Sequence, residues 1–236
     1  MTFVQHLDEL RTRLLRSIAV ILAAVLISMI FYRDLVNIAT IPHYRAMSWL
    51  GASARFILQG IGSVGSVMKL AIIVGFFFSS PYVARELWGF VSAGLYRNER
   101  RYVAAFAPVS YLLFILGCVF GYFLLIPYAL YAMVSFLPLE KIDPVLAIGE
   151  YLSFVLNLTI ILGLVFQLPL GMVFLTKIGL VPPDRYRSWR RHAILGNIVL
   201  AAVVSPPDLL SMAVFALPLL VLYEIGLWCS VWASAW

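Results

Sequence analysis

The feature that most constrains this chain is a run of 23 residues, from Val103 to Leu125, that contains no charged side chain. A segment of this length and composition is typical of a helix that crosses the hydrocarbon core of a membrane, which is about 30 Å thick. A second run, from Val67 to Ala84, is almost as apolar. Only 12% of the 236 residues are charged, whereas roughly a quarter of a soluble domain is charged. The chain is therefore an integral membrane protein.

A short charged stretch, residues 95–101, separates these two runs and carries three arginines and the single carboxylate of Glu99. Three arginines do not lie in hydrocarbon, so the stretch is a loop in water. It has two interpretations. It is either an ordinary positively charged inner loop, or a docking site in which Glu99 accepts a cation from another molecule.

The apolar runs together predict an all-α polytopic membrane protein with six transmembrane helices, which forms one integral-membrane domain over residues 1–236. The spans are expected at about residues 17–32, 67–84, 103–127, 151–175, 193–204 and 209–228. The last two are expected to be short, because the 12 residues from 193 to 204 give a helix of only about 18 Å. Residues 1–16 are amphipathic and are predicted to form an interfacial helix. Residues 34–66 are expected to form an outer cap of short helices.

Arginine and lysine counts orient the chain. With the amino terminus inside, twelve of these residues fall on the inner side of the membrane and five on the outer side. Inner loops carry such an excess, so both termini are predicted to be cytoplasmic.

Several polar residues lie within or beside the predicted spans. Gln167 has Gly163 and Gly171 four residues to either side, a stripe that favours either packing within the chain or contact with a partner's transmembrane helix. Glu224 is interpreted as a snorkelling or paired acid, and Asp208 as the cap of the last helix. Ser79 and Ser80 are expected to satisfy backbone groups near Pro81.

The sequence argues against several chemistries. It has no phosphate-binding loop of the ATPase type and no cysteine and histidine spacing that would hold a metal, so no cofactor is predicted. An intramembrane protease would need a base inside a span, and none of the three histidines lies there. A small solute transporter, with Gln167 and Glu224 along its path, would show repeat symmetry between its halves, which the sequence lacks. The net charge of +6 points to anionic lipids and not to nucleic acid.

Five motifs in order along the chain resemble the TatC family, the multi-spanning component of the twin-arginine protein translocase. They are HLDELRTRL at 6–14, GLYRNERR at 94–101, FQLP at 166–169, SPPD at 205–208 and YEIG at 223–226. The resemblance covers essentially the whole chain.

The resemblance implies a non-enzymatic receptor for signal peptides with two consecutive arginines, in the bacterial cytoplasmic (inner) membrane. It also implies single-span partners of the TatA and TatB type, an oligomeric complex and use of the proton-motive force to export folded proteins. The family's recognition acids fall on Glu9 and Glu99, and nearby signature positions are Arg11, Leu14, Phe90 and Tyr96. Many members carry glutamate where this chain has Gln167, which favours hydrogen bonding over proton transfer at that position.

Overall fold

The structure is a computed structural model that describes residues 3–51, 55–57, 62–95, 100–135, 145–205 and 209–234. Nearly all of these residues are helical. The elements in chain order are α1 (Phe3–Ile30), α2 (Tyr32–Leu50), β1 (Arg55–Ile57), α3 (Gly62–Gly94), α4 (Arg100–Phe120), the π-helical turn η1 (Gly121–Leu125), α5 (Ile126–Ser135), β2 (Val145–Ala147), α6 (Ile148–Val165), α7 (Leu168–Lys177), α8 (Pro183–Val204) and α9 (Leu209–Ser234).

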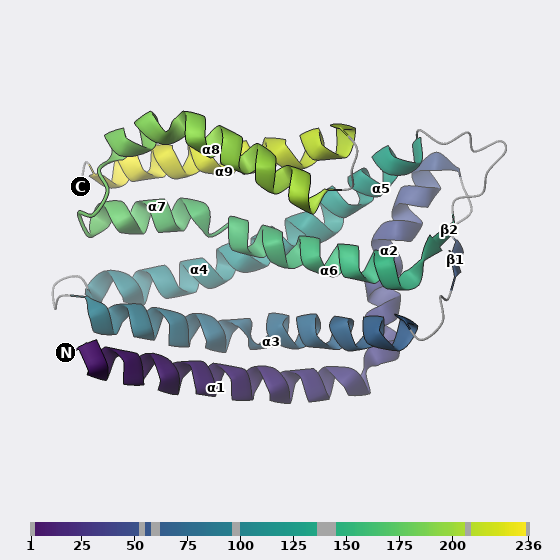
Figure 1. Cartoon of the computed structure of the whole chain (residues 1–236), viewed down its shortest axis with the longest axis horizontal. Coiled ribbons are helices and arrows are strands. Elements are labelled where there is room, and N and C mark those ends of the chain that lie inside the picture. The colour runs from purple at the N-terminus through teal and green to yellow at the C-terminus, as the bar shows by residue number, and fades with distance from the viewer. Residues whose placement is uncertain are drawn as a thin grey trace.

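The long helices lie roughly side by side, and their ends gather at two opposite ends of the molecule (Figure 1). The start of α1, the end of α3, the turn between α7 and α8 and the end of α9 share one end, which we call the inner end. The helices α2 and α5 and the strands β1 and β2 lie toward the other end, the outer end. Among these helices, α1 packs along α3, and α9 packs against both α7 and α8.

Within the part of the chain that the structure describes, five helical segments are long and apolar enough to cross a membrane. They are Val4–Ile30, Gly65–Gly94, Ala105–Ser135, Ile148–Lys177 and Ser211–Ser234. Many of their large apolar side chains are exposed, such as Leu26, Leu112 and Leu217. Such exposure is favourable in a membrane, because lipid tails surround those side chains.

The first helix differs from the prediction of an interfacial helix over residues 1–16 followed by a separate span over 17–32. Instead, α1 runs without a break from Phe3 to Ile30. No glycine or proline lies between these residues, so nothing interrupts the backbone hydrogen bonds. The charged first turns therefore continue the axis of the first apolar helix.

The prolines shape the middle of the chain. Ser80 Oγ donates to the carbonyl of Phe77 over 2.6 Å, the carbonyl that Pro81 leaves without its usual donor; this confirms the role predicted for that serine. Pro127 lies just after the π-helical turn, and the helical run continues to Ser135 instead of ending near residue 127. Pro169 cannot donate to Val165, and the predicted span 151–175 is accordingly two helices, α6 and α7, with a turn at Phe166 and Gln167.

The last two helices extend beyond the spans that were predicted at 193–204 and 209–228. α8 has 22 residues and α9 has 26. The arginine-rich segment before residue 193, which lies outside the predicted spans, is helical from Pro183, so the 12 residues from 193 to 204 are only the second half of α8.

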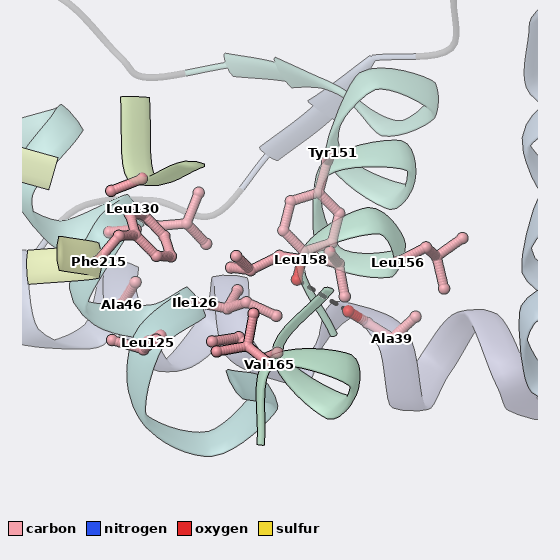
Figure 2. Close-up of a cluster of buried hydrophobic side chains, with 14 of the residues drawn as sticks. Ala39, Ala46, Leu125, Ile126, Leu130, Tyr151, Leu156, Leu158, Val165 and Phe215 are labelled. Carbon is pink, nitrogen blue, oxygen red and sulfur yellow. Dashed lines mark hydrogen bonds between the residues drawn. The ribbon is translucent and has the colours of Figure 1, made fainter. Parts of the chain in front are cut away.

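The outer end contains much of the larger cluster of buried hydrophobic side chains and the only strands among the described residues. The 19-residue α2 replaces the short helices that we had expected. β1 and β2 pair in parallel, with Phe56 opposite Leu146, so the described fold is not purely α. Figure 2 shows the buried side chains that join α2, α5, α6 and α9 there, including Ala46, Ile126, Leu158 and Phe215. Tyr151 donates its hydroxyl hydrogen to the carbonyl of Ala39 over 2.8 Å.

Candidate functional site

The candidate site lies at the inner end, where the start of α1 meets the second half of α3. The two helices run in opposite directions and are packed along their length (Figure 1). Glu9 and Arg13 are four residues apart and so share one face of α1. That face meets Glu86, Gly89 and Phe90 of α3.

Arg13 joins two carboxylates from different helices. Its Nε and Nη2 both donate to Glu9 Oε1, over 2.9 and 2.7 Å. Its Nη1 donates to Glu86 Oε2 over 3.0 Å. The side chains of Glu9, Arg13 and Glu86 are 21%, 27% and 11% exposed, so water screens these ion pairs only in part. We call these three residues the carboxylate–arginine cluster.

Two neighbours set the shape of the cluster. Gly89 makes room for Arg13, because a Cβ at that position would overlap Arg13 Nη1. The ring of His6 stacks on Phe90, with ring centres 4.4 Å apart and planes 17° apart. The glycine and the stacked rings therefore allow the start of α1 to lie close to the end of α3.

Glu9 Oε2 is a buried oxygen without a hydrogen-bond partner among the described residues. Both donors of Arg13 that reach Glu9 use Oε1, and Glu9 Oε2 is enclosed without a hydrogen-bond donor among the described residues. An enclosed acceptor without a donor is unfavourable by about 1–3 kcal/mol. A guanidinium that reaches Oε2 would gain a charge-assisted bond without breaking an existing one.

The other predicted recognition residues have different surroundings. Arg11 and Leu14 are exposed on α1, on the side away from the cluster. Phe90 is half-buried against His6. Tyr96 and Glu99 lie outside the described residues.

Sequence reasoning missed Arg13 and Glu86 as site residues. The spacing of Glu9 and Arg13 was a usable signal, because oppositely charged residues four apart on a helix form a pair. No local pattern pointed to Glu86, which lies 73 positions from Arg13.

A second polar contact joins the turn between α6 and α7 to α4. Ser110 Oγ donates to Gln167 Oε1 over 2.7 Å, and Gln167 Nε2 donates to the carbonyl of Ser110 over 3.1 Å. A Cβ on Gly163 would lie 2.6 Å from the ring of Phe114, also on α4, whereas one on Gly171 would meet nothing within 4 Å. Gln167 and Gly163 thus make contacts within the chain, and Gly171 faces open space.

The remaining predicted polar residues are Glu224 and Asp208. Arg190 Nη2 donates to Glu224 Oε2 over 2.7 Å, and both side chains are nearly half exposed, so Glu224 is a paired acid. Asp208 lies outside the described residues. Among the described residues, no three histidine, cysteine, aspartate or glutamate side chains gather closely enough to hold a metal ion.

Comparison with known proteins gives one consistent result. The sequence profile of the family described as "Sec-independent protein translocase protein (TatC)" matches residues 5–218. The chain is 37% identical over 229 residues to the Sec-independent protein translocase protein TatC of Halothiobacillus neapolitanus, covering 97% of this chain and 62% of that relative. It is 31% identical to the TatC protein of Escherichia coli, covering 96% of this chain and 87% of the relative.

A solved structure agrees with these relatives. The fold matches a crystal structure of the twin arginine translocase receptor TatC with a TM-score of 0.86 and 31% sequence identity. The match covers 97% of this chain and 99% of the other.

Proposed function

The chain belongs to the TatC family of Sec-independent protein translocase proteins, and on that basis we propose that it is the translocase subunit that receives twin-arginine signal peptides. It acts without an active site of its own. Its part in transport is to recognise the signal of a folded cargo protein and to assemble with single-span TatA- and TatB-type subunits. The complex then uses the proton-motive force to export the folded protein.

In this proposal six helical segments enter the bacterial cytoplasmic membrane, and both termini are cytoplasmic. Support comes from the five long apolar helices, from the apolar second half of α8, and from the termini of α1 and α9 at one end of the molecule (Figure 1). The distribution of arginine and lysine assigns that end to the inside. In a variant without Cys118 and Cys229, a membrane-impermeant thiol reagent applied from outside should label Ser48→Cys and leave Asp184→Cys unlabelled; the opposite pattern would overturn the orientation.

The observation that carries the recognition proposal is the free oxygen of Glu9 in the carboxylate–arginine cluster. A guanidinium that displaces the side chains enclosing this oxygen would donate to it in a fixed geometry, which the ammonium of lysine reproduces poorly. Glu99, in the charged stretch between α3 and α4, is the principal acceptor of the arginine pair, and Glu9 assists from α1. Arg11, Leu14 and Tyr96 belong to the same two sequence motifs, and in this proposal they contact parts of the peptide beyond the arginine that Glu9 receives.

The experiment measures binding of a labelled twin-arginine peptide to the full chain in detergent, with a twin-lysine peptide as the ligand control. Glu99→Gln should weaken binding roughly 10- to 150-fold, the worth of a hydrogen bond to a charged group. Glu9→Gln should weaken it less. Glu224→Gln is the matched control, because Glu224 is also a paired acid at the inner end but lies on α9. Parent-like binding by both Glu9→Gln and Glu99→Gln would place recognition elsewhere and leave the charged loop as a topology signal.

Partner contacts complete the proposal. Because Gln167 and Gly163 pack against α4, a partner's transmembrane helix meets the stripe at Gly171, where the surface of α7 is open. Exposed arginines in the first turns of α8, Arg185, Arg187 and Arg191, are suited to anionic lipid head groups. The alternative of a solute transporter gains no support, because Glu224 pairs with Arg190 while Gln167 is bonded to Ser110.

A further inference from the structure

Glu86 is the most enclosed member of the carboxylate–arginine cluster, with a side chain only 11% exposed. The residue as a whole is only 8% exposed. A carboxylate so placed is unfavourable unless it is paired. Glu86 Oε2 accepts a hydrogen bond from Nη1 of Arg13. The ion pair of Glu86 is therefore with α1 and not with a group on its own helix.

The three charges of the cluster sum to −1. Without Glu86, the charge of Arg13 would cancel that of Glu9, and the pair would offer no net attraction to another cation. Arg13 could also turn Nη1 toward Glu9 Oε2 and occupy both oxygens of one carboxylate, the common bidentate geometry. In the structure Glu86 prevents both, because it holds Nη1 and leaves Glu9 Oε2 free.

We propose that Glu86 is a positioning residue for signal recognition: it neutralises and holds Arg13, so that Glu9 keeps a free oxygen and the cluster keeps one net negative charge for the incoming arginine. Arg13 then acts as an internal competitor that Glu86 restrains. This inference rests on the proposed function, since it assigns a role within the same binding site.

The charge balance predicts a distinct pattern among variants. Glu86→Gln retains an acceptor for Nη1 and removes the charge, so the cluster becomes neutral. The lost attraction, for a charge on the order of 6 Å from the ligand in a partly screened site, is equivalent to a roughly 3- to 100-fold loss of affinity. Arg13→Gln combined with Glu86→Gln restores a net charge of −1 through Glu9, and the affinity should return to within about threefold of the parent.

A purely structural role gives a different result. If the ion pairs served only to hold α1 against α3, the double variant would lack all of them and would bind no better than Glu86→Gln. The salt concentration gives a second readout, because salt screens the attraction between charges. Raising it should weaken twin-arginine binding in the parent and the double variant, whose clusters carry a net charge of −1. It should weaken binding less in Glu86→Gln, whose cluster is neutral.

The test measures twin-arginine peptide binding by the parent, Glu86→Gln, the double variant and Glu9→Gln, each as the full chain in detergent and checked for an unchanged thermal unfolding midpoint. Weaker binding by Glu86→Gln with recovery in the double variant supports the inference. Parent-like binding by Glu86→Gln, or a loss that the double variant does not recover, overturns it. The Glu9→Gln variant separates the two proposals: if it weakens binding while Glu86→Gln does not, only the role of Glu86 is wrong, and if neither Glu9→Gln nor Glu99→Gln weakens binding, the recognition site itself is wrong.

Discussion

His43 should make the outer end of the protein sensitive to acid. Its side chain is fully buried on α2, among the rings of Tyr44, Phe56 and Tyr151. Neither ring nitrogen has a hydrogen-bond partner among the described residues. Burial lowers the pKa of His43 from 6.5 to about 4, because the surrounding rings cannot replace the water that stabilises the imidazolium.

The direction of the effect follows from proton binding. Between pH 6.5 and pH 4 the unfolded chain binds a proton at this histidine and the folded chain does not, so the free energy of unfolding falls as the pH falls. With the two pKa values above, the loss between pH 7.5 and pH 5 is about 2 kcal/mol. For a chain of this length that corresponds to a fall of roughly 4–8 °C in the unfolding midpoint.

The assay is thermal unfolding of the purified protein in detergent from pH 7.5 to pH 4.5, for the parent and His43→Phe. The phenyl ring keeps the aromatic contacts and removes the titrating group, so the variant should lose this part of the pH dependence. It should also be at least as stable as the parent at pH 7.5, because two unpartnered nitrogens are gone. His192→Gln, at an exposed histidine of α8, is the control and should behave like the parent. An equal fall with pH in the parent and His43→Phe would refute the reasoning.

Two further substitutions test the helix contacts. Gly117→Ala should lower the free energy of unfolding by about 1–3 kcal/mol, because its Cβ would lie 2.7 Å from a backbone carbonyl of α6; Gly171→Ala, which meets open space, should not, and similar losses in both would argue against close packing. Gln167→Leu should lower the free energy of unfolding by about 0.6–1.7 kcal/mol, the range for hydrogen bonds within membranes, because Ser110 loses its hydrogen-bond partner. Its transport activity should persist in a cargo-export assay, and loss of transport at unchanged stability would point to a functional polar site.

The sequence alone determined the class of the protein, the existence of its long helices and its family. These properties depend on local composition, because an uncharged run of 23 residues is confined to a membrane whatever surrounds it. The predicted helix ends were less accurate. Charged residues were taken as boundaries, yet α1 and α8 pass through their charged segments, since a helix ends where its hydrogen bonds are broken and not where its side chains become polar.

Only the tertiary structure decided which polar groups meet. The antiparallel packing of α1 on α3 brings Glu86 to Arg13 across 73 positions of the chain, and Gln167 to Ser110 across 57. Neither pair has a local periodicity that announces it. Glu9 was identified through its motif, but that one of its oxygens is occupied and the other free depends on where α3 places Glu86 and where Gly89 leaves room for Arg13. A side chain's partners are set by the packing of distant helices, and that packing depends on contacts spread along their whole length.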